Sequence, residues 1–348
     1  MQPDAAMPTA HRLLWFGAEA PMPRSAVTLD GDVCGRLVFE PGAEAGTWVA
    51  GIDLGTLLAG TLCVPSLILG QRAPRRYRMY ATWEGGGALD LVSITLPEDT
   101  KSPLPWPKGD YGPVGPPQRR AEAGIDCFET VDTLTGCRLQ IEVESGSTPP
   151  EVDLAVSLRP RLLNDIADDG SEAPTLPVPG FSQMSCADDI ARQICSPVSV
   201  AMVLAALGIP RDLEQFAYAS RHPQHRLFGI WPANLAAAWH AGASGVIRTF
   251  DSAAQAARIL TAGYPIVTSI RFEAGELMDA PLPRTGGHLV VLRGLGRDRV
   301  TVNDPAGANG SDVAREYDRR AFLRAWLGDR GVGYLLWPRQ NIGLEPAP

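Results

Sequence analysis

One cysteine of the chain stands where nucleophilic chemistry is favoured. Cys195 lies just before an apolar run at 197–207, PVSVAMVLAAL, which predicts a buried helix. Unpaired N–H groups at a helix start carry partial positive charge, so they lower the pKa of a thiol and hold the attacking thiolate. Pro197 fits the first turn, which needs no amide hydrogen there. The alternative is a core cysteine that acts as a small buried hydrophobe.

A histidine that could serve as the base of this thiol opens a predicted strand. His288 follows Gly286 and Gly287 and begins the run HLVVLRGL at 288–295. Glycines let a second backbone approach closely, so this histidine is expected to face a cleft. The alternative is a histidine with a purely structural role.

A carboxylate ends the next predicted strand. Asp304 follows RVTVN at 299–303, and the short turn between this run and 288–295 predicts a hairpin. The hairpin would bring His288 and Asp304 to the same end, where a carboxylate can accept the imidazole N–H, fix its tautomer and stabilise the imidazolium. The alternative is an Asp-Pro turn that only closes a strand.

A glutamine upstream of the cysteine could stabilise a developing oxyanion. Gln183, in PGFSQ, lies twelve residues before Cys195, and its amide could donate beside the N–H of the nucleophile itself. Gln193 is the rival, but it lies on the tight approach to the helix, so its side chain is expected to point elsewhere. We therefore favour Gln183.

Metal and cofactor chemistry is not expected. His222 and His225 are spaced as an i, i+3 pair, yet no third ligand follows nearby. The six cysteines include no CxxC pair, which argues against a zinc knuckle and a dense disulfide framework. Cys127 and Cys137 could pair across a hairpin or remain reduced in their strands.

The second half of the chain reads as helices followed by an antiparallel sheet, an α+β layout. Helices are expected at 197–207, in RDLEQFAYAS, WPANLAAAWHAG and SAAQAARILTAG, and around 314–328. Strands are expected at 265–270, 288–295, 299–303 and 331–337.

The first half reads as short strands with turn signals between them, which favours a β-sandwich. The runs lie at 36–40, 46–54, 77–83, 89–96, 137–143 and 152–158, and the Pro-rich stretch 97–120 predicts a long surface loop. The strand pattern stops at 159, and Pro-rich sequence follows. We therefore predict a sandwich-like domain at 1–160, a linker at 161–178 and a second domain at 179–340.

Composition sets limits on function. The 348 residues have 45% apolar and 20% charged residues and a net charge of −8, which is ordinary for a soluble globular protein. There is no basic stripe for nucleic acid, no apolar run long enough to span a membrane and no signal peptide. As the sequence stands we expect a cytoplasmic protein, or an exported one if a signal was removed; the oligomeric state stays open.

The ordered set FSQ, CSPVSVAMVLAALG, GGHLVVLRGL and VTVNDP resembles the papain-like cysteine peptidases of family thirty-nine, the bacteriocin-leader-processing type, and more closely their stand-alone bacterial relatives. The resemblance covers about 178–337. It implies that Gln183, Cys195, His288 and Asp304 match the oxyanion glutamine, nucleophile, base and orienting acid. The first half resembles the β-rich domain that precedes the peptidase-like domain in some of these relatives, and its role stays open.

Two features separate this chain from typical members. Ser196 stands where the family typically has glycine after the nucleophile, and a serine there could alter access to the site. The exporter members carry membrane and nucleotide-binding domains, but this chain has no GxxxxGK[ST] motif.

Three functions compete. The preferred one is a thiol hydrolase whose substrate is a peptide or protein. It would cleave a peptide bond or a related amide bond through an acyl-enzyme. The second is an acyl transferase that uses the same Cys-His-Asp site, because fold does not choose the acceptor. The third is a binding or scaffold protein with a degenerate site.

Overall fold

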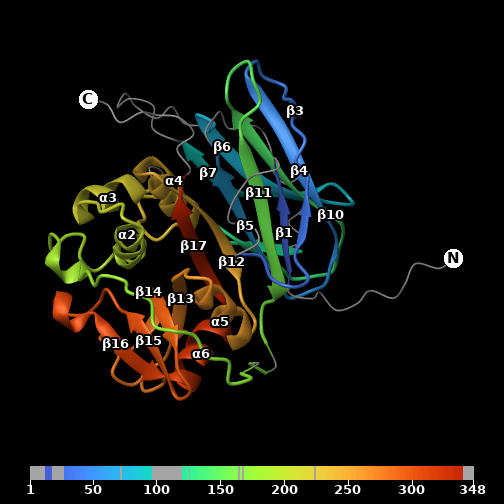
Figure 1. Cartoon of the computed structure of the whole chain (residues 1–348). Helices are drawn as coiled ribbons and strands as arrows, with labels where there is room; N and C mark the ends of the chain where they lie inside the picture. Colours follow the sequence, from blue (N-terminus) through green and yellow to red (C-terminus); the bar gives the residue numbers. More distant parts are fainter. Residues whose placement is uncertain are drawn as a thin grey trace, which may run out of the picture.

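A computed structural model shows three β-sheets, with helices gathered around the third (Figure 1). The structure describes residues 12–17, 27–70, 73–95, 120–124, 126–163, 165–166, 168–222 and 225–339. The chain has mixed α+β architecture, as the sequence predicts: two sheets come from the first half, and the helices and third sheet come from the second.

The first half forms two sheets that face each other as a sandwich. Their orders are β2-β1-β11-β5-β9-β8 and β3-β4-β10-β6-β7. The strands are β1 (Arg12–Phe16), β2 (Val33–Gly35), β3 (Glu40–Pro41), β4 (Thr47–Leu57), β5 (Thr61–Leu69), β6 (Arg76–Trp83), β7 (Gly87–Thr95), β8 (Ala121–Ala123), β9 (Phe128–Thr130), β10 (Leu134–Glu144) and β11 (Val152–Pro160).

Strand β10 shows why this half folds as a sandwich. Its side chains alternate between buried Leu139, Ile141 and Val143 and outward-facing polar residues, so the strand is apolar on one face only. The buried face packs against residues of the opposite sheet, such as Leu154 and Val156 of β11. The two sheets therefore share one core between them.

The second half forms one antiparallel sheet with helices on both faces. Its order is β12-β17-β13-β14-β15-β16. The strands are β12 (Ala243–Thr249), β13 (Ile266–Phe272), β14 (Thr285–Leu295), β15 (Arg299–Asn303), β16 (Ala314–Asp318) and β17 (Val332–Pro338). The helices are η1 (Gln183–Ser185), α2 (Cys195–Ala206), α3 (Leu213–Ser220), α4 (Trp231–Ala241), α5 (Ala253–Thr261), η2 (Gly310–Asp312) and α6 (Arg319–Leu327).

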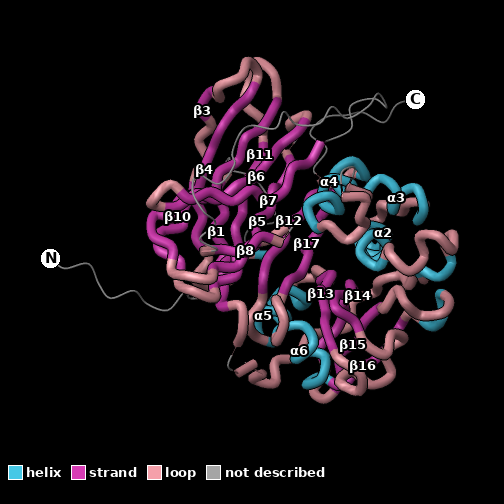
Figure 2. The backbone as a smooth tube through the Cα atoms, turned by 180° about the vertical axis from the view of Figure 1, so that it is seen from behind, coloured by secondary structure: helices cyan, strands magenta, loops and turns pink. Residues whose placement is uncertain are grey.

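The two faces of this sheet carry different helices. Helices α2 and α4 share a core with Leu289 and Val291 of β14, whereas α5 and α6 pack on the side of Val290 and Leu292. The view from behind shows α2, α3 and α4 grouped at one end of this half (Figure 2). Alternation along β14 thus divides the interior into two clusters.

The sandwich covers the edge of the third sheet. On the edge strand β12, the N–H groups of Ile247 and Thr249 donate to the hydroxyls of Ser66, at 3.0 Å, and Ser157, at 2.9 Å. The buried Arg248 forms an ion pair with Asp32 of the first half, at 3.1 Å. The central strands β5 and β11 of the first sheet are therefore buried on both faces, and the halves meet through apolar and polar contacts.

Several predicted elements were wrong or missing. Residues 36–39 form no strand; only Glu40 joins the short β3. The helix expected around 314–328 is in part a strand, because β16 occupies its first residues and α6 begins only at Arg319. Strands β1, β5 and β12 were not anticipated.

The sequence predicts two long connections, at 97–120 and at 161–178. The loop at 97–120 lies outside the described residues, except for Arg120. The predicted linker at 161–178 contains no helix and no regular strand in its described part, yet it is fastened to the second half. Leu176 N–H donates to Arg293 O at 2.7 Å, and Arg161 pairs with Asp329 at 2.8 Å.

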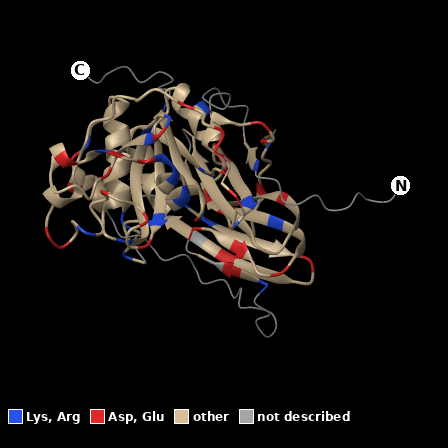
Figure 3. Ribbon diagram, turned by 90° about the horizontal axis from the view of Figure 1, so that it is seen from below, with Lys and Arg blue, Asp and Glu red and all other residues tan. Residues whose placement is uncertain are grey.

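The surface charges are mixed. Acidic and basic residues are interspersed on both halves when the molecule is seen from below (Figure 3). Among the described residues, no helix has the length and apolar character that crossing a membrane would require.

Candidate active site

The thiol of Cys195 lies at the first residue of α2. This helix is apolar all round and buried from Ser196 to Leu204, so it holds the cysteine on a rigid support. No side chain caps its N-terminus, and its first turn has no acidic residue. Cys195 itself is half-buried, unlike the fully buried residues that follow it. The partial positive charge of the helix start is therefore free to act on the thiol.

His288 faces this thiol from strand β14. His288, through its side chain and charge, and the Leu289 N–H both lower the pKa of the Cys195 thiol, so both groups lie beside the sulfur. Nearby, the hydroxyl of Ser199 on α2 donates to Leu289 O at 3.0 Å, which ties the cysteine helix to the histidine strand.

The two glycines before His288 leave space beside it. They lie in an irregular part of the β13–β14 pairing, between Thr285 and His288. Both are exposed, and a Cβ added to Gly286 or Gly287 would meet nothing within 4 Å. An approaching backbone would therefore find room at this point.

Asp304 follows β15, the hairpin partner of β14. Its Oδ1 accepts from His288 Nε2 at 2.7 Å and from Ala306 N–H at 2.9 Å. Its Oδ2 accepts from the Tyr317 hydroxyl at 2.7 Å. Since His288 uses Nε2 for the carboxylate, Nδ1 is the nitrogen left for the thiol.

The charges of the three groups support one another. Burial alone would raise the pKa of the Cys195 thiol, but the hydrogen bond and charge of His288 outweigh it and the pKa is lowered. For His288, burial disfavours the charged imidazolium and lowers the pKa, yet Asp304 and the thiolate outweigh burial and raise the pKa to about 10. For Asp304, burial raises the pKa but His288 and Tyr317 bring it below its ordinary value. The arrangement favours a thiolate–imidazolium pair beside an ionised carboxylate.

Gln183 lies against the loop that follows Asp304. Its N–H donates to Pro305 O at 2.8 Å, and Asn303 Nδ2 donates to Val178 O at 3.0 Å, so the segment before it is docked on the end of β15. The side chain is 5% exposed, and its amide oxygen has no hydrogen-bond partner. This oxygen is an acceptor and suits a donor group of a ligand, whereas the predicted oxyanion role would use the NH₂ of the same amide.

Ser196 is turned away from the thiol. Its hydroxyl is fully buried and lies 3.0 Å from the hydroxyl of Tyr334 on β17. The residue that departs from the usual glycine therefore makes a contact inside the core.

The rival residues are engaged elsewhere. Gln193 is exposed, and its amide donates to Asp189 O at 2.9 Å. Both ring nitrogens of His222 are in use, because Nε2 lies 2.9 Å from Ser93 O and Nδ1 accepts from the His225 N–H. All six cysteines, Cys127 and Cys137 included, are free thiols.

Sequence reasoning missed Tyr317. It belongs to β16, which was predicted as helix, so nothing connected it with Asp304. In the run AREYD the one large apolar side chain is that of Tyr317, which is also its one buried residue.

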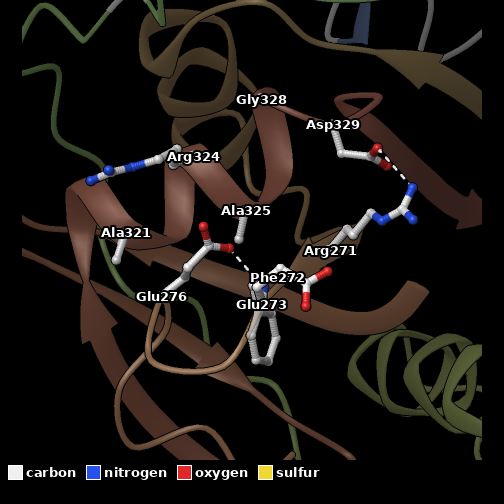
Figure 4. Close-up of a pocket in the computed structure, with 9 residues that line it drawn as sticks. All are labelled: Arg271, Phe272, Glu273, Glu276, Ala321, Arg324, Ala325, Gly328 and Asp329. Atoms are coloured by element: carbon white, nitrogen blue, oxygen red, sulfur yellow. Dashed lines mark hydrogen bonds and ion pairs between the residues drawn. The ribbon is translucent and has the colours of Figure 1, made fainter. Parts of the chain in front are cut away.

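A hollow of the surface lies away from these groups. It is formed by the end of β13, the following loop and α6, with Phe272, Glu276 and Arg324 among its lining residues (Figure 4). None of the four predicted site residues lines it.

A helix with a cysteine at its start, packed on an antiparallel sheet that carries histidine and aspartate, is the arrangement of papain-like cysteine peptidases. In agreement, residues 175–334 match the model of the Peptidase_C39 like family, which is consistent with a papain-like domain of this type in the second half of the chain. The β-rich first half lies outside the matched residues. No curated protein matches the chain.

Proposed function

We propose that the protein is a thiol hydrolase that cleaves a peptide or related amide bond through an acyl-enzyme. The observation that carries this proposal is the continuous contact from Cys195 through His288 to Asp304, with 2.7 Å between the imidazole and the carboxylate. The fold alone would not be enough, because one fold supports many functions.

Each residue has a distinct role in the proposed reaction. The Cys195 thiolate attacks the carbonyl carbon, and the oxyanion that forms accepts hydrogen bonds from the Cys195 N–H and the Gln183 amide. The His288 imidazolium gives its proton to the leaving amine, which departs and leaves a thioester. His288 then takes a proton from water, whose oxygen attacks the thioester and releases the acid and the thiol. Asp304 keeps the imidazole oriented throughout.

The space beside His288 supports an extended peptide as the substrate. Gly286 and Gly287 present bare, exposed backbone next to the histidine. A substrate chain could approach there without meeting a side chain, and its scissile carbonyl would reach the neighbouring thiol.

Selective alkylation tests the nucleophile without a known substrate. Cys34 is exposed, whereas Cys195 is only half-buried, so accessibility alone favours Cys34. We expect iodoacetamide near neutral pH to modify Cys195 at least about tenfold faster, because the thiolate is the reactive form. Mass spectrometry of the digested protein measures both sites, and Cys34→Ala is the matched control. Equal or slower labelling of Cys195 would contradict the proposal.

Cleavage of a peptide library tests the reaction itself. Wild-type protein is expected to release new amino termini, while Cys195→Ala abolishes them and Cys34→Ala does not. A reactive Cys195 with no cleavage of any peptide would favour a scaffold with a preserved but unused site.

A further inference from the structure

A buried tyrosine completes the surroundings of Asp304. The Tyr317 hydroxyl donates to Oδ2 at 2.7 Å, while His288 and Ala306 donate to Oδ1. Tyr317 is fully buried. Among the residues that the structure describes, the Tyr317 hydroxyl is therefore the one side-chain donor that holds Oδ2 of Asp304.

The phenol remains a donor at all working pH values. Burial raises the pKa of Tyr317, and the nearby charge of Asp304 raises it further, whereas Arg315 acts in the opposite direction and Asp279 adds to the rise. The other titratable groups that face Asp304 are His288 and, beyond it, Cys195. A neutral phenol facing an ionised carboxylate makes a charge-assisted hydrogen bond.

The hydroxyl and the ring of Tyr317 have separate tasks. The ring packs on Phe322, with 6.3 Å between the ring centroids, and belongs to the core that α6 covers. Only the hydroxyl reaches Asp304. A phenylalanine would keep the packing and remove the hydrogen bond.

We propose that Tyr317 is a positioning residue of the active site, which holds the Asp304 carboxylate ionised and oriented toward His288 from strand β16. The proposal rests on the proposed function, since it gives Tyr317 a role in the same site. Without the hydroxyl, Oδ2 is an unpaired buried acceptor, and the carboxylate is free to turn about its Cβ–Cγ bond.

The test is the pH dependence of Cys195 alkylation in the full chain. In Tyr317→Phe, Asp304 loses a donor to its charged form, so its pKa rises. Once Asp304 takes up a proton, His288 loses the charge that holds its own proton and the thiolate loses its partner. The acid limb of the pH profile is the part in which the alkylation rate falls as the pH is lowered. We expect its midpoint to move to a higher pH by about one unit, the scale of a charge-assisted hydrogen bond.

Tyr264→Phe is the matched control, because this half-buried tyrosine packs against the same core cluster and makes no contact with the site. It should leave the acid limb in place. A lower thermal midpoint for Tyr317→Phe with an unchanged acid limb would show a purely structural role and overturn the inference.

Two outcomes separate this inference from the proposed function. If wild-type Cys195 is no more reactive than Cys34, the proposed function fails and the positioning role fails with it. If wild-type Cys195 is reactive and Tyr317→Phe keeps the wild-type profile, only the inference fails. Should Tyr317→Phe not fold, Tyr317→fluorotyrosine keeps the shape and makes the phenol a stronger donor. Its acid limb should then move downward, and an unchanged limb would overturn the inference.

Discussion

The thiol and the imidazole stabilise each other's charged forms, which sets the pH range of the site. The pKa of Cys195 is lowered and that of His288 is raised to about 10. The thiolate–imidazolium pair therefore forms at a pH below the ordinary pKa of a thiol. It is lost as the pH rises through about 10, where the imidazolium gives up its proton. The two values describe the pair as a unit, because the groups titrate together.

His288→Ala should abolish the lowering of the Cys195 pKa. Without the imidazolium the pKa of Cys195 rises, so alkylation at pH 6 should fall by at least about tenfold, since one pKa unit is a factor of ten in thiolate below the pKa. The rate is measured from pH 5 to pH 10. The exposed His225→Ala is the control and should behave as wild type. An unchanged rate in His288→Ala would mean that another group holds the thiolate.

We expect Ser196 to contribute to stability and not to the chemistry. Ser196→Ala leaves the buried Tyr334 hydroxyl without its partner at 3.0 Å, which should cost about 1–3 kcal/mol in the free energy of unfolding. Urea denaturation measures the loss, and the double variant Ser196→Ala with Tyr334→Phe should lose less than the two single variants added together. The alkylation rate of Cys195 should stay within about twofold of wild type. A large fall in that rate with stability intact would show that Ser196 acts in the site.

Among the elements, β12 depends on side chains of the sandwich. An edge strand normally exposes unpaired N–H groups, and here Ser66 and Ser157 accept from two of them. Ser66→Ala should leave the Ile247 amide buried and unpaired, at a cost of about 1–3 kcal/mol. Hydrogen exchange of that amide and urea denaturation measure the effect. Ser147→Ala, at an exposed position, is the control. Equal stability of the two variants would contradict the assigned role of Ser66.

The elements that sequence reasoning found had either a regular alternation or an apolar run with clear ends. Strands β6 and β10 alternate, and helix α2 begins beside Pro197 and ends before Gly208, which has a φ of 78°. Strands β5 and β12 were missed; both of their faces are buried and they show no alternation, although the equally buried β11 was found.

Strand β16 was misread for a different reason. It runs directly into α6 without a glycine or proline between them, and the Asp318 side chain that caps α6, with 2.9 Å to the Ala321 N–H, is the boundary. The order and local context of Cys195, His288 and Asp304 were enough to place them together. Tyr317 could not be added, because its contact with Asp304 depends on the pairing of β15 with β16.

At the scale of the whole molecule, the predicted domain boundaries do not mark independent interiors. Leu13 and Trp15 of the first half share a core cluster with Phe250 and Trp337 of the second. The buried Arg159 guanidinium donates across the same junction to Phe250 O at 2.6 Å and to Leu327 O at 2.8 Å. We propose that the sandwich is a structural support for the peptidase-like half.

A fragment of residues 161–340 should therefore not reach the native state. It would expose the apolar junction to water and remove Asp32, the partner of Arg248. Near-ultraviolet circular dichroism and the binding of a hydrophobic dye compare the fragment with the full chain. A fragment that unfolds cooperatively at the full chain's midpoint would refute the supporting role.

The tie between Ser199 and Leu289 has a kinetic consequence. It joins the cysteine helix to the histidine strand one turn from the thiol, inside a packed interior, so the distance between the reacting groups is fixed before any substrate arrives. No assembly step should then precede the first turnover. Progress curves recorded in the first milliseconds after mixing should start at their full slope, without a lag.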